Sequence, residues 1–532
     1  MPSASSWIRS AALAPLHGAV FRGLWLASFI ANLTMWMNDV AAAWVMTSLT
    51  ANPMLVALVQ TASTLPVFLL GLPSGALADI VDRRRYFAAT QILVTVTAVV
   101  LALLALSDRL TAHLLLVLTF FNGIGLAMRW PVFAAIVPEV VAREQISAAM
   151  GLNSISINLA RVLGPLVAGA LLASLGSGAV FVLNALLGAV TVALILRWRS
   201  QARISTLPGE RFVGAMRIGW QHVQHSPRLK VVLLRIFMFF FQAMALLALL
   251  PLIARQSHGG GPGVYTLMLA ALGLGAVWAI PYFPRWRNRF SRNQFVLYGT
   301  LVEALASVVV VLATDLWVVL VAIALLGVAW ISTVNSLTVA AQMALPNWVR
   351  ARGMAIYMMA LTGGSAAGAL LWGQAASLFG VRDAVLAAAV LGPLLLLLTR
   401  RLSVDGRADP DFSPAQGASM PEAAGSIGAD EGPVMVTVEY QIDPRSSDDF
   451  AKVMQQTRRA RLRQGALSWG LFRDTVVPGR YIEYFLDETW IEHLRRLERF
   501  SATDADLRAR RLAFHLGDTE PTVQRYVAEN LK

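Results

Sequence analysis

The chain has 532 residues, of which 57% are hydrophobic and only 14% are charged. An average soluble domain carries about 25% charged residues, so this composition cannot cover the surface of a soluble protein of this length, and it also excludes a disordered chain or a coiled coil. The net charge is +13, and the absence of cysteine excludes disulfides, thiolate metal sites and cysteine nucleophiles. A polytopic membrane protein remains.

Twelve stretches of the chain are long and apolar enough to cross a bilayer, whose hydrocarbon core of about 30 Å needs roughly 20 helical residues. They must be helices, because lipid cannot satisfy the open edge of a sheet. Residues 1–19 are expected to be a short cytoplasmic lead-in and not a signal peptide. The predicted spans are 24–48, 54–78, 86–106, 113–136, 146–175, 179–197, 231–253, 264–283, 295–313, 317–344, 353–379 and 383–399. The sequence therefore predicts an all-α membrane protein with twelve transmembrane helices.

The arginines lie mostly on one side of this predicted bundle. If the N-terminus is inside, the outer connections hold only Arg109, Arg255 and Arg382. The inner connections hold Arg83, Arg84, Arg85, Arg143, Arg285, Arg287, Arg289, Arg292, Arg350 and Arg352. Because basic loops stay on the cytoplasmic side, we expect both termini to be cytoplasmic. The positive excess belongs to this apolar part, so it indicates a lipid bilayer as partner and not nucleic acid.

The longest connection, residues 198–230, is basic and divides the helices into six and six. The N-terminal half would cover 20–197 and the C-terminal half 231–401. A repeat crosses this divide, because GPLVAGALLASLG from Gly164 and GALLWGQAASLFG from Gly368 carry glycines at the same offsets. Small residues at such spacing let helices approach closely, and two sets at matching places indicate a duplication. In transporters, two duplicated halves place the substrate site at their interface.

Beyond residue 401 the composition changes. Residues 402–432 are rich in Gly, Ala, Ser, Pro and Asp and are expected to be a flexible linker. In residues 433–532 the patterns follow the order strand, helix, strand, strand, helix, strand, which is that of a ferredoxin-like α+β sandwich. The expected strands are 434–440, 466–474, 480–488 and 522–527, with helices at 448–463 and from 490 past 500 towards 514.

The connection between the second and third spans carries a motif. Its residues include Gly75, Leu77, Asp79, Arg83 and Arg84. With these residues the loop resembles the signature of the major facilitator superfamily, in which Arg and Gly usually stand at the positions of Ile80 and Asp82. Members of this superfamily are twelve-helix secondary transporters that work by alternating access. The resemblance implies a gating role for the loop, carried by Gly75, Asp79, Arg83 and Arg84.

The fifth span carries a second motif. Gly151, Gly164, Pro165 and Gly169 follow the spacing of the antiporter motif of drug-exporting facilitators. Thr119 stands where many proton-coupled members have an arginine. The turn after the first span (Leu49, Thr50, Pro53) and the pair Asn158 and Arg161 complete a resemblance of residues 20–400 to the enterobactin-exporter and macrolide-efflux branch, the transmembrane secretion effectors. This resemblance favours export over uptake.

Charged residues inside a span are costly, so each is a functional hypothesis. Asp39, beside Asn38 in the first span, is interpreted as a proton-binding carboxylate, as a counter-charge for Arg161, or as part of a fixed ion pair. Arg129 is expected nearer the cytoplasm, and Glu303 has no evident partner in the sequence. The predicted substrate and proton pathway comprises Asp39, Asn38, Asn32, Arg161, Asn158, Arg129, Gln242 and Asn335.

The C-terminal domain resembles the dimeric α+β-barrel family that includes antibiotic-biosynthesis monooxygenases. Trp469, His493 and His515 could line a pocket there, but a self-associating or regulatory domain is the favoured interpretation. No cofactor or metal is predicted. The chain as a whole is expected to be a proton-coupled exporter of small amphipathic molecules such as siderophores or drugs, and not an enzyme. An uptake permease and a transporter with a substrate-modifying C-terminal domain are the alternatives.

Overall fold

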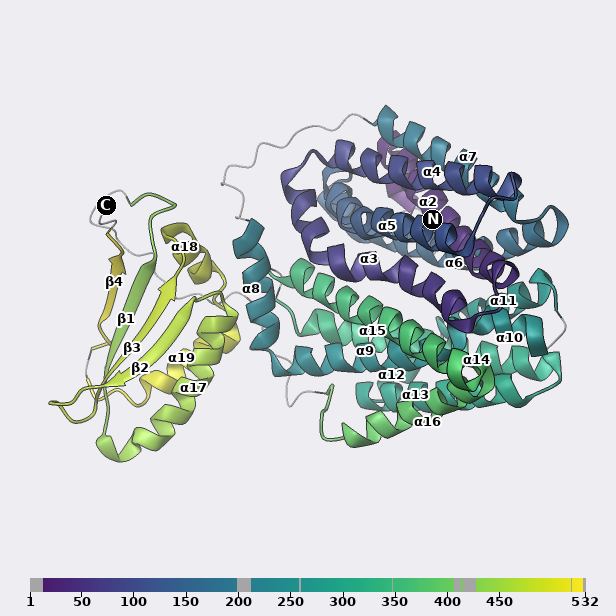
Figure 1. Ribbon diagram of the computed structural model, residues 1–532. Helices are drawn as coiled ribbons and strands as arrows, with labels where there is room; N and C mark the ends of the chain where they lie inside the picture. Colours follow the sequence, from purple (N-terminus) through teal and green to yellow (C-terminus); the bar gives the residue numbers. More distant parts are fainter. Residues whose placement is uncertain are drawn as a thin grey trace, which may run out of the picture. The chain divides into compact units, whose positions relative to one another are not determined.

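The computed structural model describes residues 13–198, 212–257, 260–346, 348–405, 413, 415, 427–517 and 519–529. The chain forms two compact units. The helical unit comprises Met1–Gly209, Val232–Ala340 and Ala355–Asp405, and the C-terminal unit comprises Glu210–Val231, Ala341–Met354 and Gly406–Lys532. Figure 1 shows long helices in the first and a β-sheet in the second.

The first half of the helical unit starts with a short 3-10 helix and continues with six long helices. Side-chain caps set several starts, because Asn52, Asp82 and Thr111 each accept a hydrogen bond from a backbone N–H of the following first turn. The elements are η1 (Ala14–His17), α2 (Ala19–Leu49), α3 (Pro53–Ile80), α4 (Arg83–Leu106), α5 (Ala112–Val140), η2 (Arg143–Gln145), α6 (Ile146–Ser174) and α7 (Ser177–Arg197). Helix α2 packs on α6 and α7, and α3 packs on α5.

The second half repeats the pattern with two additions. The expected span 231–253 is broken after Leu247 into two helices, and a short helix, α12, occupies part of an arginine-rich connection. The elements are α9 (Pro227–Leu247), α10 (Leu250–Ser257), α11 (Pro262–Ala279), α12 (Phe283–Arg289), α13 (Arg292–Leu312), α14 (Leu316–Met343), α15 (Arg350–Phe379) and α16 (Val381–Leu398). Gly275 and Gly327 let α11 and α14 touch, since a Cβ on either would meet backbone of the other helix.

Eleven of the described helices are long and apolar enough to cross a membrane. The first predicted span, within α2, is not among them. Its 31 residues reach about 46 Å at 1.5 Å per residue, so length is not the reason. Asn32, Asn38 and Asp39 lower its apolar character. The count of twelve transmembrane helices therefore stays a prediction.

The C-terminal unit contains an antiparallel sheet with strand order β2-β3-β1-β4. Its elements are β1 (Val434–Gln441), η3 (Pro444–Ser446), α17 (Ser447–Arg463), β2 (Ser468–Arg473), β3 (Arg480–Asp487), α18 (Trp490–Glu498), α19 (Ala502–Leu512) and β4 (Val523–Val527). The central pair is registered with Val434 opposite Asp487 and Gln441 opposite Arg480. Figure 1 shows α17 and α19 on the same side of this sheet.

The core of the sheet domain lies under these helices. Alternate residues of β1 are buried, and they pack with Phe450 and Met454 of α17 and with Phe485 of β3. The helix expected to run past residue 500 is interrupted, because Ser501 forms a capping box with Asp504 and starts α19 as a new helix. Two helices can thus follow the sheet surface where one straight helix was expected.

Two other segments of the chain belong to the same unit. The basic connection contains a helix that the sequence did not indicate, α8 (Phe212–Gln224), which packs on α17. Arg217 of α8 forms a 2.6 Å ion pair with Glu488. Trp348, between α14 and α15, contacts the His222 ring of α8 and the Arg499 guanidinium. The C-terminal unit is therefore assembled from three separated stretches of sequence.

Candidate functional site

Asp39 lies in α2, where its carboxylate has one short-range partner among the described residues. Ser63 Oγ of α3 donates a hydrogen bond to Asp39 Oδ1 over 3.3 Å. A carboxylate in a span with a single hydroxyl donor and no neighbouring cation is poorly compensated for loss of water. Such a group is suited to exchange a proton, because burying the neutral acid costs less free energy than burying the charged carboxylate.

Arg129 of α5 is buried and is held by α2. Its Nη2 donates to Asn32 Oδ1 over 2.7 Å and lies 3.8 Å from the sulfur of Met35. Arg129 as a whole is 4% exposed, so its side chain lies within the protein and does not extend to the surface. A buried charge with only neutral partners is expensive, and this makes Arg129 a candidate for contact with an anion.

Arg161 of α6 also faces α2. Its guanidinium carbon lies 5.4 Å from the centre of the Trp36 ring, which is a cation–π distance. Gly164, one turn further along α6, permits this approach, since a Cβ there would lie 2.5 Å from the Trp36 Cβ. The contacts of the described residues include no bond between Arg161 and Asp39, the pair considered from the sequence.

Several buried polar atoms of α2 and α6 have no hydrogen-bond partner among the described residues. They are Trp36 Nε1, Asn38 Nδ2, Arg161 Nε, Asn153 Oδ1 and Ser156 Oγ. Buried polar groups are almost always satisfied by protein, water or ligand. This group of unsatisfied atoms marks the part of the first half where a polar ligand or water would be best received.

The other predicted pathway residues lie in different surroundings. Asn158 donates to the carbonyl oxygen of Ser154 within its own helix. Asn335 is half-buried on α14. Gln242 of α9 is buried, and its amide donates to the Glu303 carboxylate of α13, which also accepts from Ser307 over 3.2 Å. Glu303 thus has the partner that the sequence did not reveal, and this contact engages the Gln242 amide in joining α9 to α13.

The residues of the signature loop join neighbouring helix ends. Arg83 forms a 2.6 Å ion pair with Glu139 at the end of α5, and Arg84 donates to the carbonyl oxygen of Leu196 in α7 over 2.5 Å. Asp82, which replaces the usual glycine, caps α4 by accepting from the Arg85 N–H. Gly75 and Asp79 lie in α3, but the surroundings of Gly75 and the side chain of Asp79 lie outside what the structure describes.

The motif in α6 places small residues at two contacts. Pro165 lies inside the helix, and Gly169 faces Thr266 of α11 so closely that a Cβ would overlap its side chain. Gly151 has no atom within 4 Å of a Cβ position. Within this motif, therefore, Gly164 and Gly169 are required for close helix approach, the first within a half and the second between halves.

The two halves of the helical unit meet where α2 ends and α11 begins. Arg255 of α10 donates to the Thr47 carbonyl oxygen, and Trp44 stacks on Tyr265 with ring centres 6.0 Å apart. A Cβ on Gly373 of α15 would lie 3.4 Å from the Met54 Cα of α3. Sequence reasoning missed these contacts, because they join residues about 200 or more positions apart. They close this end of the interface between the halves.

A buried cluster of charges lies in the C-terminal unit, around Glu483. This carboxylate is fully buried and accepts from Tyr440 Oη at 3.0 Å, Trp469 Nε1 at 3.0 Å and Arg461 Nε at 3.1 Å. Burial raises its pKa, but Arg461 and Arg511 outweigh burial and hold the pKa below the usual value. Trp469 is thereby a structural donor to Glu483.

The two histidines considered from the sequence are also engaged. His493 Nε2 accepts from Arg525 Nε over 3.2 Å, so Nδ1 carries the proton and donates to Asp487 over 2.8 Å. Burial keeps the pKa of His493 below its ordinary value. His515 Nδ1 accepts from the Gln441 N–H. Both rings therefore serve the packing of the sheet domain.

We expect the sheet domain to lose stability in acid. Glu483 and Asp487 have pKa values below their ordinary 4.5 and 3.8. Their stabilising contribution is therefore complete above those ordinary values and disappears as the pH falls through the lower folded-state values. The opening free energy of the sheet measures this loss. It is obtained from hydrogen exchange of the β1 and β3 amides in the full-length protein, from about pH 7 to about pH 3, with correction for intrinsic exchange rates. An opening free energy that stays constant to about pH 3 would contradict this expectation.

Comparison with known proteins places these features in a family. The profile of one family, described as transmembrane secretion effector, matches residues 10–532. Macrolide efflux protein A of Streptococcus pyogenes is 24% identical over 245 residues, which are 46% of this chain and 60% of that protein. The chain thus spans less than two thirds of this relative's length. The Staphyloferrin A transporter of Staphylococcus aureus is 21% identical over 358 residues, 67% of this chain and 89% of that protein.

One more relative and two solved structures are also membrane transporters. The enterobactin exporter EntS of Shigella boydii is 26% identical over 171 residues, 32% of this chain and 41% of that protein. The solved nucleoside transporter NupG has a TM-score of 0.56 at 12% identity over 72% of this chain and 99% of that one. A bacterial homologue of the lysosomal transporter Spinster, inward-facing and unoccupied, has a TM-score of 0.57 at 17% identity, over 72% and 96%. At such identities the structures show the fold alone. The chain belongs to the transmembrane secretion effector family within the major facilitator superfamily of membrane transporters.

Proposed function

We propose that the protein is a proton-coupled exporter of small amphipathic molecules of the siderophore or drug class, in a bacterial plasma membrane with both termini cytoplasmic. The observation that carries this proposal is the set of unsatisfied buried polar atoms on α2 and α6, together with the sparsely partnered Asp39 of α2. Proton exchange at Asp39 and substrate contact at Arg161 and its neighbours would couple the two fluxes. The relatives named for efflux and export support this direction over the uptake permease.

The pathway residues divide by role in this proposal. Asp39 exchanges the proton, while Asn38, Arg161 and Trp36 offer donors and a ring face to a bulky ligand. Arg129, held by Asn32, contributes positive charge on the same side of α2. Buried guanidinium groups whose protein partners carry no negative charge favour an anionic or electron-rich substrate.

Alternating access would require the contacts between the halves near Thr47 and Tyr265 to open in each cycle. The chain has no native cysteine, so a cross-link can be placed without removing any. We expect Met54→Cys combined with Gly373→Cys to form a disulfide on oxidation, because a Cβ at position 373 would lie 3.4 Å from the Met54 Cα. Both cysteines are introduced together with Ala57→Gly, since the same Cβ would lie 2.5 Å from the Ala57 Cβ. Efflux should fall to background when the pair is oxidised and recover after reduction.

Each single cysteine variant, treated in the same way, is the control for the cross-linked pair. An oxidised pair that transports at the normal rate would show that this end need not open. Efflux of labelled macrolides or siderophores from cells, with the disulfide yield read on a gel, provides the measurement.

The C-terminal domain is proposed to be ferredoxin-like and to associate with a second copy of itself. Its element order and its strand order β2-β3-β1-β4 support the fold. The sheet face opposite the helices carries apolar side chains, including Tyr484 stacked on Phe472, which is 61% exposed. An apolar sheet face without covering helices supports self-association. Since Trp469 and His493 have structural partners, a substrate-modifying domain is not favoured.

A further inference from the structure

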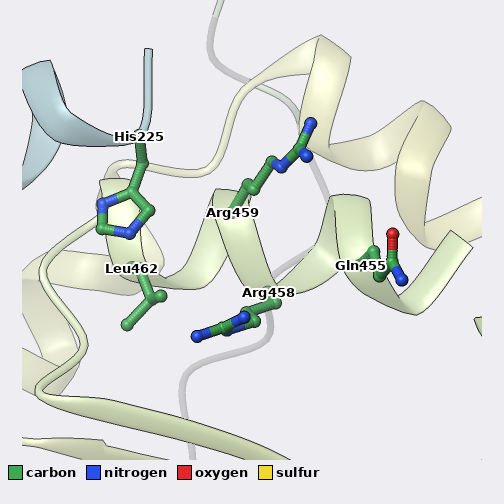
Figure 2. Close-up of a pocket in the computed structure, with 5 residues that line it drawn as sticks. All are labelled: His225, Gln455, Arg458, Arg459 and Leu462. Atoms are coloured by element: carbon green, nitrogen blue, oxygen red, sulfur yellow. The ribbon is translucent and has the colours of Figure 1, made fainter. Parts of the chain in front are cut away.

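A pocket of about 240 Å³ lies within the C-terminal unit, between the end of α8 and the second half of α17. It is lined by His225, Gln455, Arg458, Arg459 and Leu462. Figure 2 shows the His225 ring above Leu462, with the two arginines extending from α17 on different sides. The lining therefore combines two guanidinium groups, an imidazole and an amide with one apolar side chain, and it includes no carboxylate.

The two arginines of the pocket differ from the other arginines of α17. Arg461 pairs with Glu483 at 3.1 Å and Arg463 with Asp504 at 3.5 Å. Arg458 and Arg459 have no ion pair with any residue of the described ranges. The acids at the start of α17 do not compensate them, since nine residues separate Asp449 from Arg458, about 14 Å along the axis. Two like charges thus adjoin one concave surface without a protein counter-ion.

The donors of the pocket suit a tetrahedral oxyanion. His225 Nδ1 lies 2.9 Å from the Gln221 carbonyl oxygen, so it donates there and leaves the Nε2 lone pair to accept from a hydroxyl group of the ligand. Arginine is the side chain best matched to phosphate, because its fork of N–H groups binds two oxygens at once. The Gln455 amide adds a neutral donor. The C-terminal turns of α8 and α17 carry partial negative charge, which stabilises the cations but supplies no oxygen ligand in the pocket.

His225 lies close in the chain to a candidate membrane span. Pro227, two residues later, begins α9 and a candidate membrane span, Pro227–Gln256. A headgroup of an anionic phospholipid and a soluble phosphate compound share the chemistry that this pocket would recognise. We infer that the pocket binds a phosphate-bearing anion, which bridges α8 and α17 and so fastens the sheet domain to the helix that leads into the second half.

Thermal unfolding of the purified full-length protein in an uncharged detergent tests this inference. Inorganic phosphate is added against chloride at equal ionic strength, and short-chain phosphatidylglycerol against short-chain phosphatidylcholine. A ligand that binds only the folded state raises the unfolding temperature. We expect at least one of the two anions to do so, with an apparent Kd at least about tenfold higher in Arg458→Gln/Arg459→Gln.

The matched control is Arg445→Gln/Arg473→Gln, which removes the same charge from exposed positions outside the pocket. Gln455→Glu is a second variant, which keeps both arginines and adds a competing carboxylate, and it should weaken binding as well. Stabilisation by phosphate alone identifies a soluble ligand, and stabilisation by phosphatidylglycerol alone identifies a lipid. Absence of stabilisation by either anion, or equal stabilisation of wild type, control and pocket variants, would overturn the inference.

Discussion

Replacing Asp39 by asparagine is expected to abolish proton-driven efflux while the protein still reaches the membrane. Asparagine has nearly the same shape and can still accept the hydrogen bond from Ser63, but it cannot take up or release a proton. Loss of a proton-transferring group lowers rates by about 100-fold or more. Accumulation of labelled macrolides and siderophores in everted vesicles, driven by an imposed pH gradient, measures the effect.

Asp315→Asn is the matched control for this experiment. Asp315 is exposed and caps α14 by accepting from the Trp317 N–H over 2.7 Å, and asparagine caps helices equally well. Gradient-driven efflux by Asp39→Asn at the normal rate would reject the proton-exchange role. If Asp39 had only a structural role, the variant would instead be less abundant in the membrane, and the molecules present would transport normally.

Glu483→Gln is expected to destabilise the sheet domain strongly. The carboxylate accepts from three side chains and balances the buried charge of Arg461. A glutamine in its place removes that charge and directs N–H groups at a site occupied by donors. Breaking a buried ion pair on one side costs about 3–5 kcal/mol. Hydrogen exchange of the β1 and β3 amides in the full-length protein gives the opening free energy.

Glu439→Gln provides the comparison for the buried position. Glu439 lies on β1 and pairs with Arg480 at 2.8 Å, and the Glu439 and Arg480 side chains are 43% and 37% exposed to water. Solvent-exposed pairs of this kind contribute little. We expect Glu439→Gln to leave the opening free energy nearly unchanged, and equal effects of the two substitutions would show that the Glu483 cluster does not stabilise the domain.

The predictions from sequence succeeded where a local pattern determines the structure. Apolar runs of sufficient length gave the long helices, and the alternation of Val434, Val436 and Val438 with less apolar residues gave β1, which is buried on that face. The two strands expected at 466–474 and 480–488 were also placed correctly, as β2 and β3. In each case the residues that determine the element lie within the element itself.

The contacts at the candidate site could not be predicted in this way. Gln242 and Glu303 are 61 residues apart, and only the packing of α9 on α13 brings them together. Arg161 was considered with Asp39, whereas its guanidinium lies over Trp36, which is also on α2. Charge suggests the kind of partner, but helix rotation decides which side chain is reached.

Helix α8 was missed for a related reason. Its sequence, FVGAMRIGWQHVQ, lies in a basic stretch and is too short to span a bilayer, so it was assigned to a connection. The surface on which α8 packs is contributed by residues more than 200 positions later. Its apolar residues alone therefore do not indicate a packed helix.

The composition of the C-terminal unit bears on how the protein can be shortened. A Cβ at Gly465 would lie 3.3 Å from the Ile218 side chain, and Trp348 contacts Arg499, so residues inside the transporter sequence rely on the tail for burial. A stop codon in the linker would remove these contacts and expose an apolar, protease-sensitive surface to water. Poor expression of such a truncated protein would therefore reflect the contacts that its remaining residues have lost. The tail is better regarded as an integral part of the fold than as a separable domain.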